Sequence, residues 1–171
     1  WQLQAEQLGT AHAVQQASPN VNDDDVVLIL YGDVPLTKAE TLEALVKDVS
    51  ENNISLLTVK LDDPTGYGRI VRENGKDTSI VQDKDANYEI KEIQEVNTGI
   101  IAVRAAYLNE CMNKIDNKNV QGEYYLTDLI ALAVNDGHKV LTTQVENSYE
   151  VEGVNDKKQL VRLERIFQRG I

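Results

Sequence analysis

The fold is decided by residues 26–61, VVLILYGDVPLTKAETLEALVKDVSENNISLLTVKL. The run 26–30 is apolar and β-branched without alternation, which is typical of a strand buried on both faces. Thr37 and Glu40 have capping-box spacing, and apolar residues then recur at helical spacing as far as Val49, which predicts a helix over 38–51. Residues 54–61 predict the next strand, so the three segments form a βαβ unit.

The rest of the chain adds a hairpin and further helices to this unit. Asn74-Gly75 between two short β runs, 69–72 and 78–81, predicts a β-hairpin. The same reasoning predicts strands over 100–103 and 139–145 and helices over 105–115, 126–134 and 156–168. This order predicts an α/β fold with an open, mostly parallel but mixed sheet and a β-hairpin insertion.

The N-terminal residues suggest an incomplete sheet. Trp1 to Gln4 resemble the end of a strand with no room for what precedes it, so the sheet is expected to be N-terminally incomplete. Thr10 is expected to be the N-cap of a helix that continues to Ala17. Helix N-termini can bind phosphate or a polar base edge, although an isolated Gly-Thr pair is usually only a cap.

Composition excludes several classes of function. The 171 residues carry 28 acidic and 17 basic side chains, for a formal charge of −11. Residues 1–37 contain no Lys or Arg. Nucleic acids and anionic membranes attract basic surfaces, so neither is an expected partner. The length suits one domain at about 150 residues per domain.

The chain also lacks the signals of membrane insertion and secretion. Its longest apolar run, 26–31, is far shorter than the roughly 20 residues that a membrane helix needs. There is no basic segment followed by an apolar signal core. The one cysteine, Cys111, suits a reducing compartment. A cytoplasmic location is the resulting expectation.

Asp33 is the first candidate for chemistry. It lies three residues beyond the apolar run that ends at Leu30, and ligands of open α/β sheets bind beyond the carboxyl ends of strands. A metal ligand and a plain turn residue before Pro35 are both compatible with this position. Asp23-Asp24-Asp25 has D-x-D spacing but precedes the strand, so a solvated loop is favoured there. His12 and His138 have no Cys or second His at metal spacing, which disfavours zinc.

Three glycine-containing segments are weaker candidates. Residues 66–68 (GYG), 97–99 (NTG) and 152–155 (EGVN) each place a glycine beside polar side chains. Each could bring backbone close to a ligand, and each could equally be a tight turn or a helix cap. No single one of these segments identifies a function.

Taken together and in order, six motifs resemble one enzyme family. They are 3–12 (LQAEQLGTAH), 31–36 (YGDVPL), 61–70 (LDDPTGYGRI), 95–100 (EVNTGI), 121–128 (QGEYYLTD) and 150–155 (EVEGVN). The family is the bacterial bifunctional N-acetylglucosamine-1-phosphate uridyltransferase and glucosamine-1-phosphate acetyltransferase. The resemblance covers essentially the whole chain, and it implies the pyrophosphorylase domain with its nucleotide-diphospho-sugar transferase type of sheet.

The resemblance implies roles for individual residues, grouped by what they hold. Uracil would be held by Gln4, Gly9 and Thr10. The nucleotide and ribose would lie under Tyr31, Gly32 and Asp33. The amino sugar would be contacted by Gly68, Asn97 and Thr127. Asp33 and Asn155 would ligate the catalytic Mg²⁺, and one carboxylate with one amide oxygen suits this ion.

The implied reaction joins UTP and N-acetylglucosamine-1-phosphate into UDP-N-acetylglucosamine and pyrophosphate. The sugar phosphate would attack the α-phosphorus in line, with catalysis by positioning and charge neutralisation. Cell-wall precursor synthesis is the implied process. Gln82 departs from the family pattern, because the family usually has a glutamate at this position that contacts the sugar. The amide of Gln82 therefore leaves the choice of sugar open.

The resemblance also implies parts that this chain does not contain. The Gly-rich loop with the Arg and Lys that hold the triphosphate has no counterpart, and neither does the C-terminal domain for acetyl transfer and trimerisation. The expected division is therefore a partial uridyltransferase domain over 1–156 and the start of a linker helix over 157–171, from a parent homotrimer. This chain alone is expected to be impaired or inactive. The alternatives are a non-catalytic sugar-nucleotide-binding module and a pyrophosphorylase for another sugar-1-phosphate.

Overall fold

The computed structural model describes residues 1–73, 77–119 and 121–170. The strands are β1 (Val26–Ile29), β2 (Asn53–Lys60), β3 (Arg69–Glu73), β4 (Asp77–Val81), β5 (Glu95–Arg104) and β6 (Lys139–Val145). The α-helices are α1 (Thr10–Ala17), α2 (Ala39–Lys47), α3 (Tyr88–Lys91), α4 (Ala105–Met112), α5 (Asp128–Asn135) and α6 (Lys157–Gln168). Short 3₁₀ turns are η1 (Ser18–Asn20), η2 (Asp83–Asp85) and η3 (Ser148–Val151).

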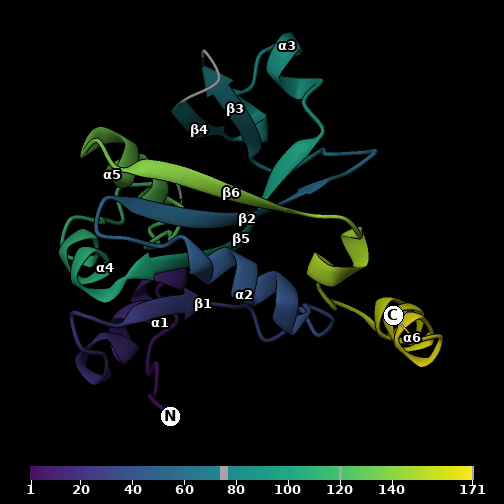
Figure 1. The fold of residues 1–171 in the computed structure, drawn as a ribbon, viewed down its shortest axis with the longest axis horizontal. Helices are drawn as coiled ribbons and strands as arrows, with labels where there is room; N and C mark the ends of the chain where they lie inside the picture. Colours follow the sequence, from purple (N-terminus) through teal and green to yellow (C-terminus); the bar gives the residue numbers. More distant parts are fainter. Residues whose placement is uncertain (74–76, 120, 171) are drawn as a thin grey trace.

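These strands form one mixed sheet with β5 at its centre. β2 pairs with β5 on one side, and both β1 and β3 pair with β5 on the other. β1 lies against the second half of β5, where Ile29 is opposite Ile101, whereas β3 joins its first half, where Arg69 is opposite Val96. The end of β1 therefore points along β5 toward the hairpin β3–β4. Figure 1 shows that hairpin and α3 above the central strands and α6 at the side.

A bulge interrupts β5 where β1 ends. Leu56 of β2 is opposite Ile101 and Thr58 is opposite Asn97, so residues 98–100 face the single residue Leu57. The Thr98 hydroxyl donates to the Leu57 carbonyl, and the Gly99 N–H donates to the Asn97 side chain. Bulges bend a strand and redirect its side chains, and they are frequent beside active sites.

Two apolar layers cover the sheet, which explains why its central strands lack a simple alternation. Ile54 and Leu56 of β2 pack in one cluster with α1, α4 and α5. Leu57 and Val59 of the same strand pack in the second cluster with α2. All residues of β2 from Ile54 to Val59 are buried as a result. The predicted α/β class with an open mixed sheet is confirmed.

Several predicted details are wrong. The described ladders are mainly antiparallel rather than parallel, because β5 runs against β1, β2 and β3; β2 and β6 form the parallel pair. Residues 1–4 form no strand. The N-cap of α1 is Gly9, not Thr10.

Other elements differ mainly at their ends. α2 begins at Ala39 after Lys38 and has no side-chain cap, because the Thr37 hydroxyl donates to Glu150 instead. The strand predicted over 100–103 begins at Glu95, since the bulge lies inside it. α6 is confirmed with a capping box of Asp156 and Gln159. β3 and β4 pair as predicted, while the Asn74-Gly75 turn lies outside the described residues.

No helix within the described ranges is long and apolar enough to cross a membrane.

Candidate functional site

The Asp33 loop and the Asn155 loop lie side by side. β1 delivers residues 31–33, and the turn η3 after β6 leads to residues 152–155. The Val154 N–H donates to the Asp33 carbonyl oxygen at 2.8 Å. A Cβ placed at Gly153 would lie 3.4 Å from Asp33 Oδ2. Asp33 and Asn155 are both exposed residues of these two adjoining loops.

Tyr31 covers the bulge in β5. Gly99 is buried with φ of +85°, and a Cβ there would lie 2.7 Å from the Tyr31 hydroxyl oxygen. Only glycine combines this backbone conformation with so close an aromatic ring. Burial raises the pKa of Tyr31, and the Asp33 charge raises it further. Tyr31 therefore remains a neutral hydrogen-bonding group next to Asp33.

A second group forms where β3 leaves β5. The Asn97 N–H donates to the Gly68 carbonyl at 2.9 Å. A Cβ at Gly68 would lie 3.5 Å from the Gln82 side-chain nitrogen and 3.6 Å from its oxygen. The hairpin β3–β4 thus brings together Gly68, Gln82 and Asn97, three of the residues that the resemblance assigns to the sugar.

The exposed Gln82 side chain also lines a large pocket. Its volume is about 980 Å³, and its walls include the turn η2, the start of α5 and the loop residues Asp116, Lys118, Asn119 and Gln121. Thr127 and Asp128 contribute the α5 side. Burial raises the pKa of Asp128, and the Asp116 carboxylate raises it further. The side chains that line this pocket include amides, hydroxyls and carboxylates, which suit a ligand that carries several hydroxyl groups.

The N-terminal segment forms a third group. Gln4 donates to the Gly9 carbonyl at 3.2 Å and lies 3.0 Å from His12 Nδ1. A Cβ at Gly9 would approach the Tyr124 carbonyl oxygen to 2.5 Å, so only glycine fits there. The Leu126 N–H donates to the Thr10 hydroxyl at 2.9 Å. This contact places Gln4, Gly9 and Thr10 against the chain segment that leads directly to Thr127.

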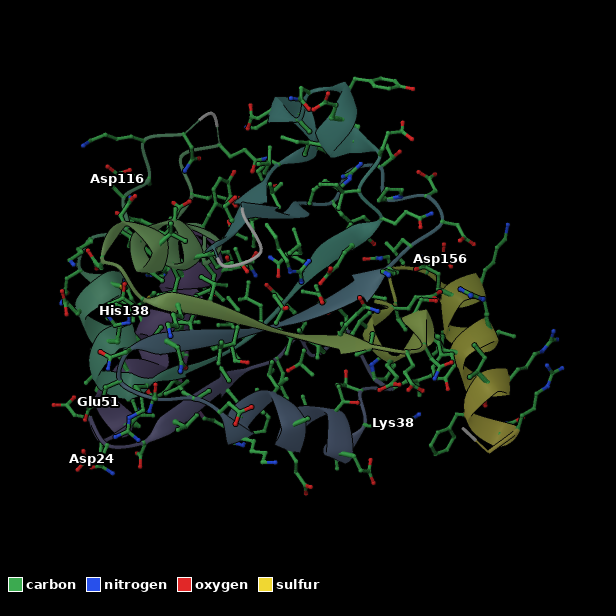
Figure 2. All side chains as sticks on the ribbon, turned by 45° about the horizontal axis from the view of Figure 1, so that its top comes forward. Asp24, Lys38, Glu51, Asp116, His138 and Asp156 are labelled. Atoms are coloured by element: carbon green, nitrogen blue, oxygen red, sulfur yellow. The ribbon has the colours of Figure 1, made fainter. Side chains whose placement is uncertain are left out.

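The site residues predicted from sequence therefore fall into three connected groups. The contacts through Leu126 join the uracil group to Thr127, and Asn97 joins the sugar group to the bulge that Tyr31 covers. The run 23–25 lies elsewhere: Figure 2 shows Asp24 near Glu51 and His138, at the opposite end from Lys38 and Asp156. The interpretation of this run as an exposed loop is confirmed.

Sequence reasoning missed three residues that lie in or beside these groups and the large pocket. His12 contributes contacts that its position in the sequence did not indicate, because its two ring nitrogens lie beside the Gln4 and Gln16 amides. Lys84 and Lys118 line the large pocket, although the sequence suggested almost no basic residues near the site. Lys84 follows Gln82 by two positions, and that spacing was a usable signal. Lys118 lies in a loop with no motif.

The residues around Asp33 fit a hard divalent cation. Mg²⁺ takes oxygen ligands, often one or two from the protein, with water and substrate phosphate completing its shell. The carboxylate of the exposed Asp33 and the amide of the exposed Asn155, on adjoining loops, would provide such a pair. Within the described ranges, no group of three or more His, Cys, Asp or Glu side chains could hold a metal ion. Asp33 and Asn155 could therefore form a metal site that has few protein ligands.

Comparison with known proteins identifies a similar fold and a family. A Bacillus anthracis protein classed as a glucose-1-phosphate thymidylyltransferase, solved in complex with sucrose, has a similar fold, with a TM-score of 0.68 and 18% sequence identity. The match covers 97% of this chain and 63% of that one, so the chain spans less than two thirds of this relative. The nucleotidyl transferase family model matches residues 1–149. By this match, the chain belongs to the nucleotidyl transferase family.

Proposed function

We propose that this chain carries the uridine and sugar sites of an N-acetylglucosamine-1-phosphate uridyltransferase. The proposal goes beyond the family assignment by naming both substrates, UTP and N-acetylglucosamine-1-phosphate. The observation that carries it is the 2.8 Å hydrogen bond from Val154 to Asp33, which joins the two loops with the proposed metal ligands. The six ordered motifs, and the amide, hydroxyl and carboxylate side chains that line the pocket beside Gln82, support the choice of substrates.

Each group of residues has a distinct task in this proposal. Gln4, Gly9 and Thr10 bind the uracil through side-chain and backbone polar groups at the start of α1. Tyr31 and Gly32 contact the ribose at the end of β1. Gly68, Gln82, Asn97 and Thr127 orient the amino sugar so that its phosphate oxygen faces the α-phosphorus. Orientation of this kind lowers the barrier of an in-line displacement without a covalent enzyme intermediate.

Asp33 and Asn155 would hold Mg²⁺ at the carboxyl end of β1. When bound, Mg²⁺ supplies neutralisation of the phosphate charge that develops during transfer. Asp33 provides negative charge that retains the cation, and its carbonyl is held by Val154. Residues 1–37 contain no Lys or Arg. Near Asp33, the negative charge of the substrate phosphates would therefore be compensated by the cation.

Substitution of Asp33 by Asn tests the metal assignment. The variant keeps the shape and the backbone contact but removes the carboxylate charge. In the full reading frame that encodes this chain, Mg²⁺-dependent formation of UDP-N-acetylglucosamine should fall by at least about a hundredfold, the upper range for losing even an indirect metal contact. Urea unfolding should be little changed, because Asp33 is exposed. Near-normal turnover would refute the metal role.

Gln82 favours a second candidate, a pyrophosphorylase for a different sugar-1-phosphate. Its neutral amide lies in the pocket, at a position where the family that this chain resembles usually has glutamate. An amide accepts hydrogen bonds from sugar hydroxyl groups without the negative charge of a carboxylate. Rates with N-acetylglucosamine-1-phosphate and glucose-1-phosphate decide between the two. A preference for glucose-1-phosphate would overturn the substrate named above, and Gln82→Glu should then shift the preference toward the acetylated sugar.

A sugar-nucleotide-binding module without catalysis is the remaining alternative. It predicts binding of UDP-N-acetylglucosamine, measured by calorimetry, without turnover in the full reading frame under any metal condition. Turnover there would exclude it.

A further inference from the structure

We infer that the buried Glu150 is a positioning residue for the metal pair Asp33 and Asn155. The inference rests on the proposed function, because it concerns the same metal site. Glu150 lies in η3 and is only 3% exposed. A carboxylate is rarely so buried unless its partners hold it. Among the described residues, the partners of its carboxylate come from one short stretch of chain, the start of α2.

Three contacts join Glu150 to that stretch. The Thr41 hydroxyl donates to Glu150 Oε2 at 2.7 Å. The Lys38 ammonium lies 3.4 Å from Oε1. The Thr37 hydroxyl donates to the Glu150 backbone carbonyl at 2.8 Å. Glu150 thus connects the turn after β6 to the first turn of α2 with both its side chain and its backbone.

Both connected segments lead directly to the metal pair. Asp33 precedes Thr37 by four residues, and Asn155 follows Glu150 by five. The hydrogen bond from Val154 to the Asp33 carbonyl joins the same two segments a second time. Two short segments, 33–37 and 150–154, are therefore joined at both ends, by the contacts of Glu150 at one end and by the bond from Val154 to Asp33 at the other. The separation of the Asp33 carboxylate from the Asn155 amide therefore depends on the Glu150 contacts.

Apart from the bond from Val154 to Asp33, the described side-chain contacts of the Asn155 loop run to α6, and they include the ion pair of Glu152 with Arg162. The Asp33 side chain is exposed. The Asn155 N–H and the Asp156 N–H are both bonded to Gln159 of α6, which orients that loop toward the helix and not toward Asp33. Indirect partners of metal ligands orient them, and removing such a partner typically weakens metal affinity by ten- to a hundredfold.

The test measures metal binding directly, without relying on turnover. Mn²⁺ replaces Mg²⁺ as the probe, and the signal of free Mn²⁺ in electron paramagnetic resonance is followed with saturating UDP-N-acetylglucosamine. Glu150→Gln keeps the size of the side chain but loses the charge that holds Lys38. We expect its Mn²⁺ affinity to fall about tenfold. Thr41→Val, which removes the partner hydroxyl while leaving Glu150 in place, should lower affinity in the same direction.

Two control variants separate positioning from general damage. Glu43→Gln makes the same chemical change on the exposed surface of α2 and should bind Mn²⁺ like the unmodified chain. Thr41→Ser keeps the hydroxyl and should restore the affinity that Thr41→Val loses. Affinity for UDP-N-acetylglucosamine without metal should be unchanged in all four variants. An equal loss of metal-free nucleotide binding in Glu150→Gln and Thr41→Val would show a structural role and overturn the inference.

The remaining outcomes distinguish this inference from the proposed function. If Asp33→Asn abolishes Mn²⁺ binding while Glu150→Gln and Thr41→Val bind normally, the metal site stands and the positioning role fails. If Asp33→Asn binds Mn²⁺ normally, or the unmodified chain binds none, the proposed metal site fails and the inference fails with it. Should Glu150→Gln not fold, Thr41→Val carries the test alone.

Discussion

Replacement of Gly99 by alanine would test the contact between Tyr31 and the bulge of β5. Two costs arise at this position. An L-residue at φ of +85° is disfavoured by about 1–2 kcal/mol. In addition, the new methyl group would lie 2.7 Å from the Tyr31 hydroxyl oxygen and 2.8 Å from its Cε2 atom, and overpacking of this kind costs about 1–3 kcal/mol. Gly99→Ala should therefore lower the free energy of unfolding by about 2–5 kcal/mol.

Urea unfolding measures this loss. With a dependence on urea of about 2 kcal/mol per M, the midpoint should fall by about 1–2.5 M. The chain offers a matched control in Gly66, which also has φ of +85° but nothing within 4 Å of its Cβ position. Gly66→Ala should show the backbone cost alone, so the difference between the two variants measures the clash with Tyr31.

A second variant assigns the difference to the ring itself. In a Tyr31→Ala background the ring is gone, and Gly99→Ala should then cost no more than Gly66→Ala does. The two substitutions should be non-additive by about 1–3 kcal/mol, as expected for residues in contact. If Gly99→Ala is no more destabilising than Gly66→Ala in the unmodified chain, Tyr31 does not cover the bulge, and the geometry described for the nucleotide side of the site is wrong.

Two further predictions concern the core. The buried Glu95 accepts two hydrogen bonds from Arg72, at 2.6 and 2.8 Å, and these bonds lower the pKa of its carboxyl group. The ionised Glu95 therefore stabilises the folded state fully above pH 4.5, the ordinary pKa of the group. This stabilisation is lost as the pH falls through the lower pKa of the folded state. Glu95→Gln should lose about 2–3 kcal/mol at pH 7 by urea unfolding and depend less on pH below 4.5, whereas an unchanged acid dependence would contradict this origin. Cys111 is fully buried, and burial raises the pKa of its thiol; it should react with a chromogenic disulfide reagent only as fast as the chain opens, and rapid reaction in the native protein would contradict its burial.

Local sequence patterns predicted most helices and strands. The segment 26–61 folds into β1, α2 and β2 as expected, because unbroken apolar runs and helical periodicity are local signals. α6 was predicted with nearly its observed bounds from the spacing of its apolar residues, and the structure adds that Asp156 caps it. Thr10 and Thr37 were predicted as caps and are not, because their hydroxyls bond to Leu126 and Glu150, which are more than a hundred residues away.

Strand direction and the bulge could not be predicted locally. The sequence suggested a mostly parallel sheet, but β5 returns in the opposite direction between β1 and β2. Residues 97–99 have the composition of a turn, and only the pairing with β2 turns them into a bulge inside a strand. Pairing partners are a property of the folded chain, and the same short motif can be a turn or a bulge according to its neighbours.

The sequence by itself determined the chemical character of the candidate site: a carboxylate after a buried strand, amides and glycines in ordered motifs, and no Lys or Arg among residues 1–37. The tertiary structure decided which of these groups meet. It placed Asp33 beside the loop of Asn155, Tyr31 over Gly99, and Gln82 against Gly68. It also revealed Glu150, to which the motif 150–155 assigned no role, as the buried link between η3 and α2. The physical reason is that residue type follows from local chemistry, whereas contacts between distant segments depend on how the strands pair and the layers pack.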